Sequence, residues 1–166
     1  GQLIHGWVII DKSQGLQSTE TTNRVRRVFD AQKAGHGGTL DPLATGVLAV
    51  ALGEATKTVP YVMDGPKTYH FTVTFGARTS SDDSEGEVLE TSDVRPSEDD
   101  VRAAMARFMG DIMQTPPKVS AIKVDGERAY DLARDGEEFE LAARPMTVYR
   151  RDILNDAPAS AALEAE

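Results

Sequence analysis

Residues 35–52 constrain this chain most, because they combine closely spaced glycines, one carboxylate, one imidazole and an apolar run: G-H-G-G-T-L-D-P-L-A-T-G-V-L-A-V-A-L. Glycines allow backbone shapes that a Cβ forbids, and they let another segment approach closely. The pair Asp41-Pro42 predicts a sharp turn, since proline fixes its own φ and disfavours the helical region for the residue before it. The run 47–52 predicts a buried strand. We therefore expect a stiff loop that presents Asp41 and His36 beside a buried strand.

Asp41 and His36 also have a plainer interpretation. An aspartate before proline is commonly a turn or cap residue, and a loop histidine is commonly solvated. Composition alone favours this plainer interpretation.

The composition is that of a soluble globular protein, and 166 residues predict one domain with a real core. The chain has no cysteine, which excludes disulfides, a thiol nucleophile and cysteine metal ligands and fits a reducing cytosol. The longest apolar run, 47–52, is far shorter than a membrane span, and the first residues do not have the order of a signal peptide. We expect a cytoplasmic, monomeric protein with no membrane partner.

The net charge of −9 argues against a nucleic-acid partner if it is taken as a whole. Its distribution is uneven, however. Residues 1–70 hold 7 Lys and Arg against 6 Asp and Glu, which gives +1, whereas residues 71–166 hold 11 against 21, which gives −10. A polyanion is therefore expected to meet the N-terminal part. Four basic residues there are either solvated or face phosphate: Arg24, Arg26, Arg27 and Lys33.

The hydrophobic pattern predicts both strands and helices. Strands are expected at 6–10, 47–52, 69–75, 88–89, 119–124 and from 146 to 148. Helices are expected after an N-cap at Ser18, over 54–62 with a break at Pro60, after a capping box at 97–100, and over 130–134. Residues 77–86 are expected to be a polar connection of a hairpin. This mixture indicates an α+β (mixed α/β) fold.

Three faces follow from these patterns. The first helix is expected to place on its core side Val25, Val28, Phe29 and Gln32. The helix after residue 97 is expected to place in the core Val101, Ala104, Met105, Phe108 and Ile112, with Gly110 interrupting near its end. The strand 69–75 is expected to share one face among Tyr69, Phe71, Val73 and Phe75.

The motif G-H-G-G-T-L-D-P-L-A-T-G-V-L, followed by G-E-A-T-K at 53–57, resembles the catalytic motif of the tRNA pseudouridine-55 synthases, the TruB family. Further segments resemble the family's other motifs in the same order: 6–18, with Ser13 and Gln17 as departures, the K-x-Y of Lys67–Tyr69, 76–86, and 114–136. Several separated motifs in the right order make a chance match improbable.

The resemblance implies a mixed, mainly antiparallel sheet flanked by helices and loops. It also implies that residues 1–166 are the N-terminal portion of a catalytic domain. The family has a later G-T-Y-I-R motif, whose arginine pairs with the catalytic aspartate, and usually an RNA-binding PUA domain. We expect both to lie beyond this sequence.

The implied reaction converts the T-loop uridine at position 55 of tRNA to pseudouridine, with no cofactor and no metal. A tRNA T-arm is the implied partner, and its target base must be flipped out of the folded loop. The resemblance assigns catalysis to Asp41, as nucleophile at C1′ or as base at C2′. It assigns to Tyr69 the wall of the base pocket and to His36 a wedge into the RNA. Without the resemblance, Tyr69 is better interpreted as a core aromatic.

The resemblance also implies substrate contacts for Gly38, Thr39 and Leu40. Lys12 and Lys67 are expected to support the loop or meet phosphate, with surface solvation as the alternative.

Two other classes of function remain open. A small-molecule phosphate site could use the loop at 35–38, although G-x-G-G matches neither common phosphate-binding spacing. A non-catalytic RNA-binding or chaperone module would bind tRNA without converting the base.

Overall fold

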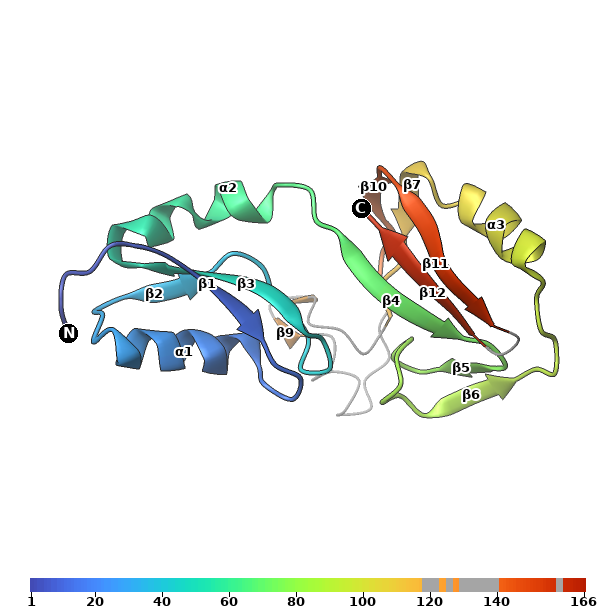
Figure 1. The fold of residues 1–166 in the computed structure, drawn as a ribbon, viewed down its shortest axis with the longest axis horizontal. Helices are drawn as coiled ribbons and strands as arrows, with labels where there is room; N and C mark the ends of the chain where they lie inside the picture. Colours follow the sequence, from blue (N-terminus) through green and yellow to red (C-terminus); the bar gives the residue numbers. More distant parts are fainter. Residues whose placement is uncertain (118–122, 125–126, 129–140, 158–159) are drawn as a thin grey trace. The chain divides into compact units, whose positions relative to one another are not determined.

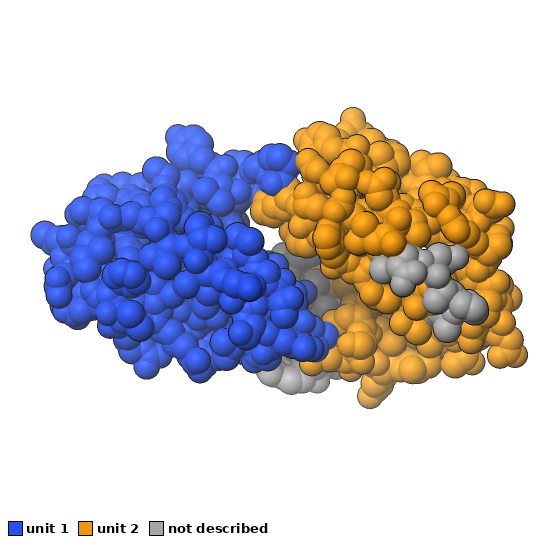
Figure 2. Space-filling model, viewed as in Figure 1, with its two compact units in different colours: residues 1–66 blue, residues 67–166 orange. Residues whose placement is uncertain are grey.

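The structure is a computed structural model, and it describes residues 1–117, 123–124, 127–128, 141–157 and 160–166. The chain forms two compact units, Gly1–Pro66 and Lys67–Glu166 (Figure 2). Each unit has its own hydrophobic core. Both units combine antiparallel strands with helices, so the α+β class expected from the sequence is confirmed. The single catalytic domain expected over the whole chain stays a prediction.

The first unit is a three-stranded antiparallel sheet with a helix, α1, on one face (Figure 1). The strand order is β1-β3-β2, so the last strand in sequence lies in the middle. The elements are β1 (Gly6–Lys12), α1 (Ser18–Val28), β2 (Ala34–His36), β3 (Gly46–Leu52), the 3-10 helix η1 (Gly53–Thr58) and α2 (Val59–Met63).

The strands β1 and β3 form where the sequence predicts them, but they are not buried throughout. On β3, Leu48 and Val50 are at most 1% exposed, whereas Val47 is 73% exposed. On β1, Ile9 is 64% exposed. Alternate residues of a strand point to opposite faces, and α1 covers one face of this sheet. The expectation of a buried strand is therefore wrong for Ile9 and Val47, although Ala51, on the same face of β3 as Val47, is 0% exposed.

Helix α1 begins at Ser18, and Gln17 is its N-cap residue without a side-chain cap. The prediction that Ser18 caps the helix is therefore wrong. The expected core side of the helix is also shifted, because Val25 is buried but Val28 is 82% exposed.

The buried stripe of α1 is largely polar and consists of Ser18, Thr21, Thr22 and Val25. These positions have the i, i+3, i+4, i+7 spacing of one helix face. The hydroxyl of Thr21 donates to the Gln17 carbonyl at 3.0 Å, and that of Thr22 donates to the Ser18 carbonyl at 2.8 Å. These bonds satisfy the hydroxyls, so the polar side chains can be buried.

The helix expected over residues 54–62 forms in two pieces, η1 and α2. Pro60 lies in the first turn of α2, where its missing N–H removes no helical hydrogen bond. It begins this helix rather than breaking one.

The second unit contains a three-stranded antiparallel sheet in the order β11-β12-β4, with α3 packed against it. Three two-stranded sheets accompany it: β10-β7, β5-β6 and β8-β9. The elements are β4 (Tyr69–Thr74), β5 (Ala77–Thr79), β6 (Val88–Thr91), α3 (Glu98–Ala106), β7 (Gly110–Gln114), β8 (Lys123–Val124), β9 (Glu127–Arg128), β10 (Arg144–Val148), β11 (Arg151–Ala157) and β12 (Ser160–Ala165).

The strand expected at 69–75 is confirmed as β4. Its alternating side chains Phe71, Val73 and Phe75 line one groove of about 290 Å³ together with α3. Tyr69, at the start of the strand, is 50% exposed.

The capping box at 97–100 is confirmed. The Ser97 Oγ accepts from the Asp100 N–H at 3.2 Å, and the Asp100 carboxylate accepts from the Ser97 N–H at 2.9 Å. Helix α3 then ends at Ala106, and Gly110 has a φ of +73°, which a continuing helix cannot accommodate. The expected helical stripe is therefore too long, because Ile112 lies on β7.

The alanine-rich C-terminal segment forms β12, the central strand of its sheet. Its pattern gives no strong strand signal, because alanine has a low strand propensity. Ala161 is nevertheless buried in the core with Val101 and Leu163. Packing against α3 explains the strand, and local preference does not.

Residues 77–86, expected to be a polar connection leading to the strand at 88–89, contain strand β5, which forms the hairpin with β6, whereas β4 pairs with β12. The strand expected from 146 is confirmed as part of β10. The strand expected at 119–124 is described only at β8, and the helix expected over 130–134 lies outside the described residues. No helix among the described residues is long and apolar enough to cross a membrane.

Candidate active site

The glycine-rich motif forms the loop 37–45 between β2 and β3. The two strands pair antiparallel, with Gly35 opposite Ala51 and His36 opposite Val50. The Gly37 N–H extends this pairing by donating to the Ala49 carbonyl at 2.8 Å. The loop therefore begins at the end of a paired strand, β2, and leads into β3, the central strand of the sheet.

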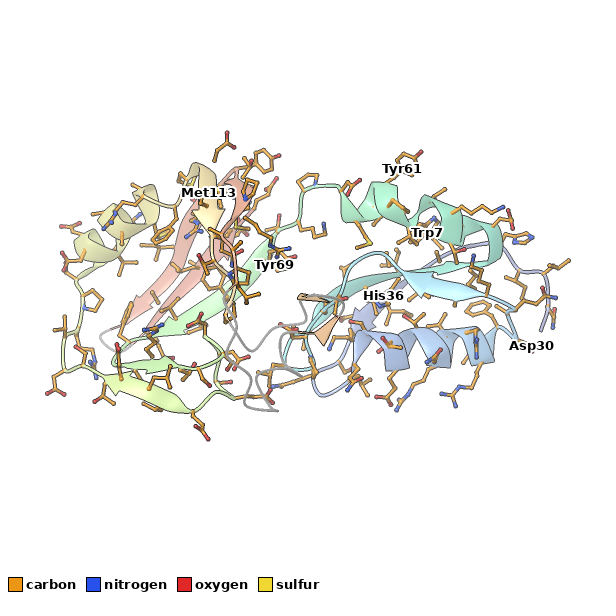
Figure 3. The ribbon with its side chains drawn as sticks, turned by 180° about the vertical axis from the view of Figure 1, so that it is seen from behind. Trp7, Asp30, His36, Tyr61, Tyr69 and Met113 are labelled. Atoms are coloured by element: carbon orange, nitrogen blue, oxygen red, sulfur yellow. The ribbon has the colours of Figure 1, made fainter. Side chains whose placement is uncertain are left out.

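Gly37 allows the loop to approach α2 closely. A Cβ on Gly37 would lie 2.9 Å from Val62 Cγ1 and 3.7 Å from Trp7 Cζ3. Figure 3 labels Trp7 and also His36, the residue before Gly37. The next residue, Gly38, has a φ of +116°, which side-chain-bearing residues rarely adopt. Both glycines are thus required by geometry, one by space and the other by its backbone angle.

Ser18 holds the middle of the loop. Its Oγ donates to the Leu40 carbonyl at 2.9 Å and accepts from the Leu40 N–H at 2.9 Å. The side chain of Leu40 packs against the hydrophobic core of this unit. Sequence reasoning missed this role of Ser18. The available signal was that Thr21, not Glu or Gln, follows three residues later, so no capping box occupies the hydroxyl.

Asp41 follows directly and is exposed. Its carbonyl accepts from the Ala44 N–H at 2.9 Å, which closes the turn predicted by Asp41-Pro42. The Pro42 carbonyl accepts from the Gly15 N–H at 2.7 Å. Within the part of the chain that the structure describes, the Asp41 carboxylate has no hydrogen-bond or ion-pair partner. The backbone on both sides is fixed by hydrogen bonds, and the Asp41 side chain is exposed.

His36 lies at the end of β2 and is half-buried. Its Nδ1 is 2.9 Å from the Gly38 carbonyl oxygen. A carbonyl only accepts, so Nδ1 carries the hydrogen and Nε2 holds the lone pair when the ring is neutral. The ring is therefore oriented by the loop beside it.

Lys12 is 1% exposed, so the alternative of a solvated surface lysine is wrong. Its ammonium group donates to the Leu16 carbonyl at 2.8 Å and to the Ser13 carbonyl at 3.1 Å. These bonds order the segment that includes Gly15, which in turn binds the Pro42 carbonyl. Through this segment, Lys12 is connected to the loop 37–45 that carries Asp41, which we call the aspartate loop.

The predicted site residues fall in both units. Lys12, His36 and the loop residues through Asp41 belong to the first unit, and Thr39 is exposed there. Lys67 and Tyr69 belong to the second unit, at and just before the start of β4. No group of three potential metal ligands occurs among the described residues.

Comparison with known proteins gives a consistent result. Residues 26–166 match the family described as "TruB family pseudouridylate synthase (N terminal domain)". The chain is 63% identical over 148 residues to a tRNA pseudouridine synthase B from Ruegeria sp. (strain TM1040), covering 89% of this chain and 49% of that protein. It is 58% identical over 165 residues to the enzyme of the same name from Gluconacetobacter diazotrophicus, covering 99% of this chain and 54% of that protein.

The fold is similar to that of a solved structure, "Crystal Structure of a Cbf5-Nop10-Gar1 Complex". The TM-score is 0.65 at 28% identity, over 96% of this chain and 38% of that chain. The chain thus spans about half the length of the curated relatives it matches. The family match extends from within α1 to the last residue and includes the aspartate loop, and on this evidence the chain belongs to the TruB family of pseudouridylate synthases.

Proposed function

We propose that the aspartate loop carries out the isomerisation of the uridine at position 55, in the T-loop of tRNA, to pseudouridine. Family membership supports this proposal, as do relatives named tRNA pseudouridine synthase B. In this reaction the N1–C1′ glycosidic bond breaks, the base turns over, and a C5–C1′ bond forms. The proton on C5 passes to solvent and N1 gains a proton, so no atom is lost overall and no oxidant or reductant is needed.

The observation that carries the proposal is the exposed Asp41 carboxylate on a loop whose backbone is fixed at Leu40, Asp41 and Pro42. A reactive group held before substrate binds loses little conformational entropy in reaching the sugar. Asp41 is the reacting carboxylate, whether it attacks C1′ or removes the C2′ proton. Both routes need the carboxylate in its ionised form.

The other predicted residues have supporting roles in this proposal. His36, oriented through its Nδ1–H, enters the RNA at the place that the flipped base leaves. Tyr69 is half-exposed, so its ring face is available to stack on the extruded uracil. The loop residues Gly38 and Thr39 lie beside Asp41 and contact the nucleotide backbone.

The proposed partner is the T-arm of a tRNA, bound by a monomer of this chain in the cytoplasm. The solved structure of similar fold is a protein complex, and we do not propose its partner proteins as partners of this chain.

A second candidate function is RNA binding without catalysis, because the chain spans about half of its relatives. Such a protein would bind the T-arm and leave the uridine unchanged.

The test is to incubate the 166-residue chain with a T-arm stem-loop RNA tritiated at uridine C5 and to measure both binding and tritium release. The proposal predicts saturable binding and tritium release, and a stem-loop with cytidine at the target position should release none. Binding without release would favour the non-catalytic candidate. Neither binding nor release would contradict both.

A further inference from the structure

A row of charged side chains crosses the three-stranded sheet of the second unit. Asp152 on β11 pairs with Glu164 on β12, and Glu164 pairs with His70 on β4. Residues directly opposite each other in an antiparallel sheet share a face, and their Cβ atoms lie about 5 Å apart. Two neighbouring carboxylates repel at this distance, so the row is stable only if cations lie beside it.

Arg150 and His70 supply those cations. Arg150 Nη1 donates to Asp152 Oδ2 at 2.8 Å, and its Nη2 donates to Glu164 Oε1 at 2.5 Å. His70 Nε2 donates to Glu164 Oε2 at 2.6 Å. Both oxygens of Glu164 are thus occupied, one from β4 and the other from the residue before β11. We call His70, Glu164 and Arg150 the Glu164 bridge.

The surroundings of the bridge reinforce it. The hydrogen bond from His70, and then the charge of Arg150, lower the pKa of the Glu164 carboxyl below its usual value. Glu166 adds a further carboxylate, 3.6 Å from Arg150 Nη2, and it accepts from Thr68 Oγ1 at 3.4 Å. The bridge therefore ties the first residues of β4 to the last residues of β12.

This end of β4 is the end that carries Tyr69. The neighbouring row of the sheet places Tyr69 opposite Ala165, on the other face from His70. In the sheet as described, β4 is an edge strand with β12 as its ladder partner. An edge strand has ladder hydrogen bonds on one side only. Side-chain interactions at its end therefore affect its conformational order more than they would in a central strand.

We propose that Glu164, held by Arg150 and acting through His70, is a positioning residue for Tyr69. The Glu164 bridge keeps the first residues of β4 in register with β12, so that the Tyr69 ring is held in one orientation before substrate binds. The functional role of this positioning rests on the proposed function, in which Tyr69 contacts the flipped base. The ordering of the first residues of β4 by the bridge does not depend on that function.

The test is amide hydrogen exchange of the full chain at pH 7, corrected for intrinsic rates, for the wild type and three variants. Glu164→Gln removes the charge of the bridge. His70→Gln is the conservative variant, because its amide group can still donate a hydrogen bond to Glu164. Glu98→Gln is the matched control, because it removes the same charge from an exposed pair with Arg102 in the same unit.

We expect Glu164→Gln to lower protection at the start of β4 about tenfold, and Glu98→Gln to change it less than about twofold. His70→Gln should retain most of the protection that Glu164→Gln loses. Unchanged protection in Glu164→Gln, or a loss in His70→Gln as large as that in Glu164→Gln, would overturn the proposal. Amides of the first unit report whether each variant remains folded.

A parallel measurement of tritium release from T-arm RNA separates the two proposals. If the wild type neither binds nor converts RNA, the proposed function fails while the exchange result still decides the bridge. If the wild type converts RNA and Glu164→Gln leaves both exchange and conversion unchanged, the bridge proposal alone fails.

Discussion

Gly37 and Ser18 hold the loop of Asp41 from two sides, the first by having no side chain and the second through its hydroxyl. Gly37 lets the loop contact α2, and Ser18 binds both backbone groups of Leu40. Neither residue has a reactive role in the proposed chemistry. Both should therefore affect the stability of the loop, and through it the placement of Asp41.

Gly37→Ala is expected to lower the free energy of unfolding by about 1–3 kcal/mol, because its Cβ would lie 2.9 Å from Val62 Cγ1. Chemical denaturation measures the change. Gly35→Ala is the matched control, since its Cβ would meet the nearest atom, Thr56 Cγ2, at an ordinary 3.9 Å. The double variant Gly37→Ala/Val62→Ala should recover part of the loss. Equal effects of the two single glycine substitutions would contradict this account.

Ser18→Ala is expected to lower the free energy of unfolding by about 1–3 kcal/mol, because it leaves the Leu40 N–H and carbonyl without their partner. Thr22→Val provides the comparison, since the Thr22 hydroxyl donates only to a carbonyl of its own helix. Amide exchange at residues 37–45 should rise in Ser18→Ala and stay unchanged in Thr22→Val. A rise in both variants would show that the helix, not the loop contact, is responsible.

At the same scale, the sequence predicted the turn at Asp41 but not the burial of Lys12. The Asp-Pro pair predicts the turn because proline restricts both residues locally. The burial of Lys12 depends on two carbonyls, those of Ser13 and Leu16, converging on its ammonium group. No local preference encodes that convergence, so a lysine at a strand end looks like a solvated residue.

At the scale of elements, the capping box of α3 makes the stability of that helix depend on pH. Hydrogen bonds that the Asp100 carboxylate accepts from the Ser97 N–H and hydroxyl lower its pKa. A carboxyl whose folded pKa is depressed stabilises the fold above its unfolded pKa, about 3.9 for aspartate, and this contribution is lost as the pH falls through the folded pKa.

Ser97→Ala should therefore cost about 1 kcal/mol of unfolding free energy at pH 7, and its difference from the wild type should shrink as the pH falls below about 4. Denaturation of both proteins at a series of pH values measures this. Ser84→Ala, at an exposed serine of the same unit, should match the wild type throughout. A constant Ser97→Ala difference from pH 7 to pH 3 would contradict the role of Asp100.

The elements that the sequence predicted are those with strong local signals. The capping box fixed the start of α3, and clean alternation identified β4. The buried face of α1 could not be predicted, because it is a stripe of hydroxyl residues whose bonds lie within the helix. The strand β12 could not be predicted either, because alanines become strand residues there only by packing under α3.

At the scale of the whole chain, each of the two units has its own core, and the cores share no residue. Leu48→Ala should cost about 2–5 kcal/mol, and amide exchange should rise across the first unit while the second is unaffected. Leu163→Ala should give the reverse pattern. A uniform rise over both units in either variant would show that the chain unfolds as one cooperative body.

The central claim is that Asp41 is the reacting carboxylate on a loop that is already in place. The most direct measurement compares tritium release from C5-tritiated T-arm RNA by the wild type, Asp41→Asn and Asp30→Asn, with RNA affinity measured in parallel. Asp30 is the matched control, because it is an exposed aspartate of the same unit whose partner is the N-terminal amine, 3.7 Å away. We predict that Asp41→Asn binds the RNA within about twofold of the wild type, since the site of substitution is exposed, and releases no tritium, whereas Asp30→Asn releases it at the wild-type rate. Release by Asp41→Asn at the wild-type rate would contradict the claim.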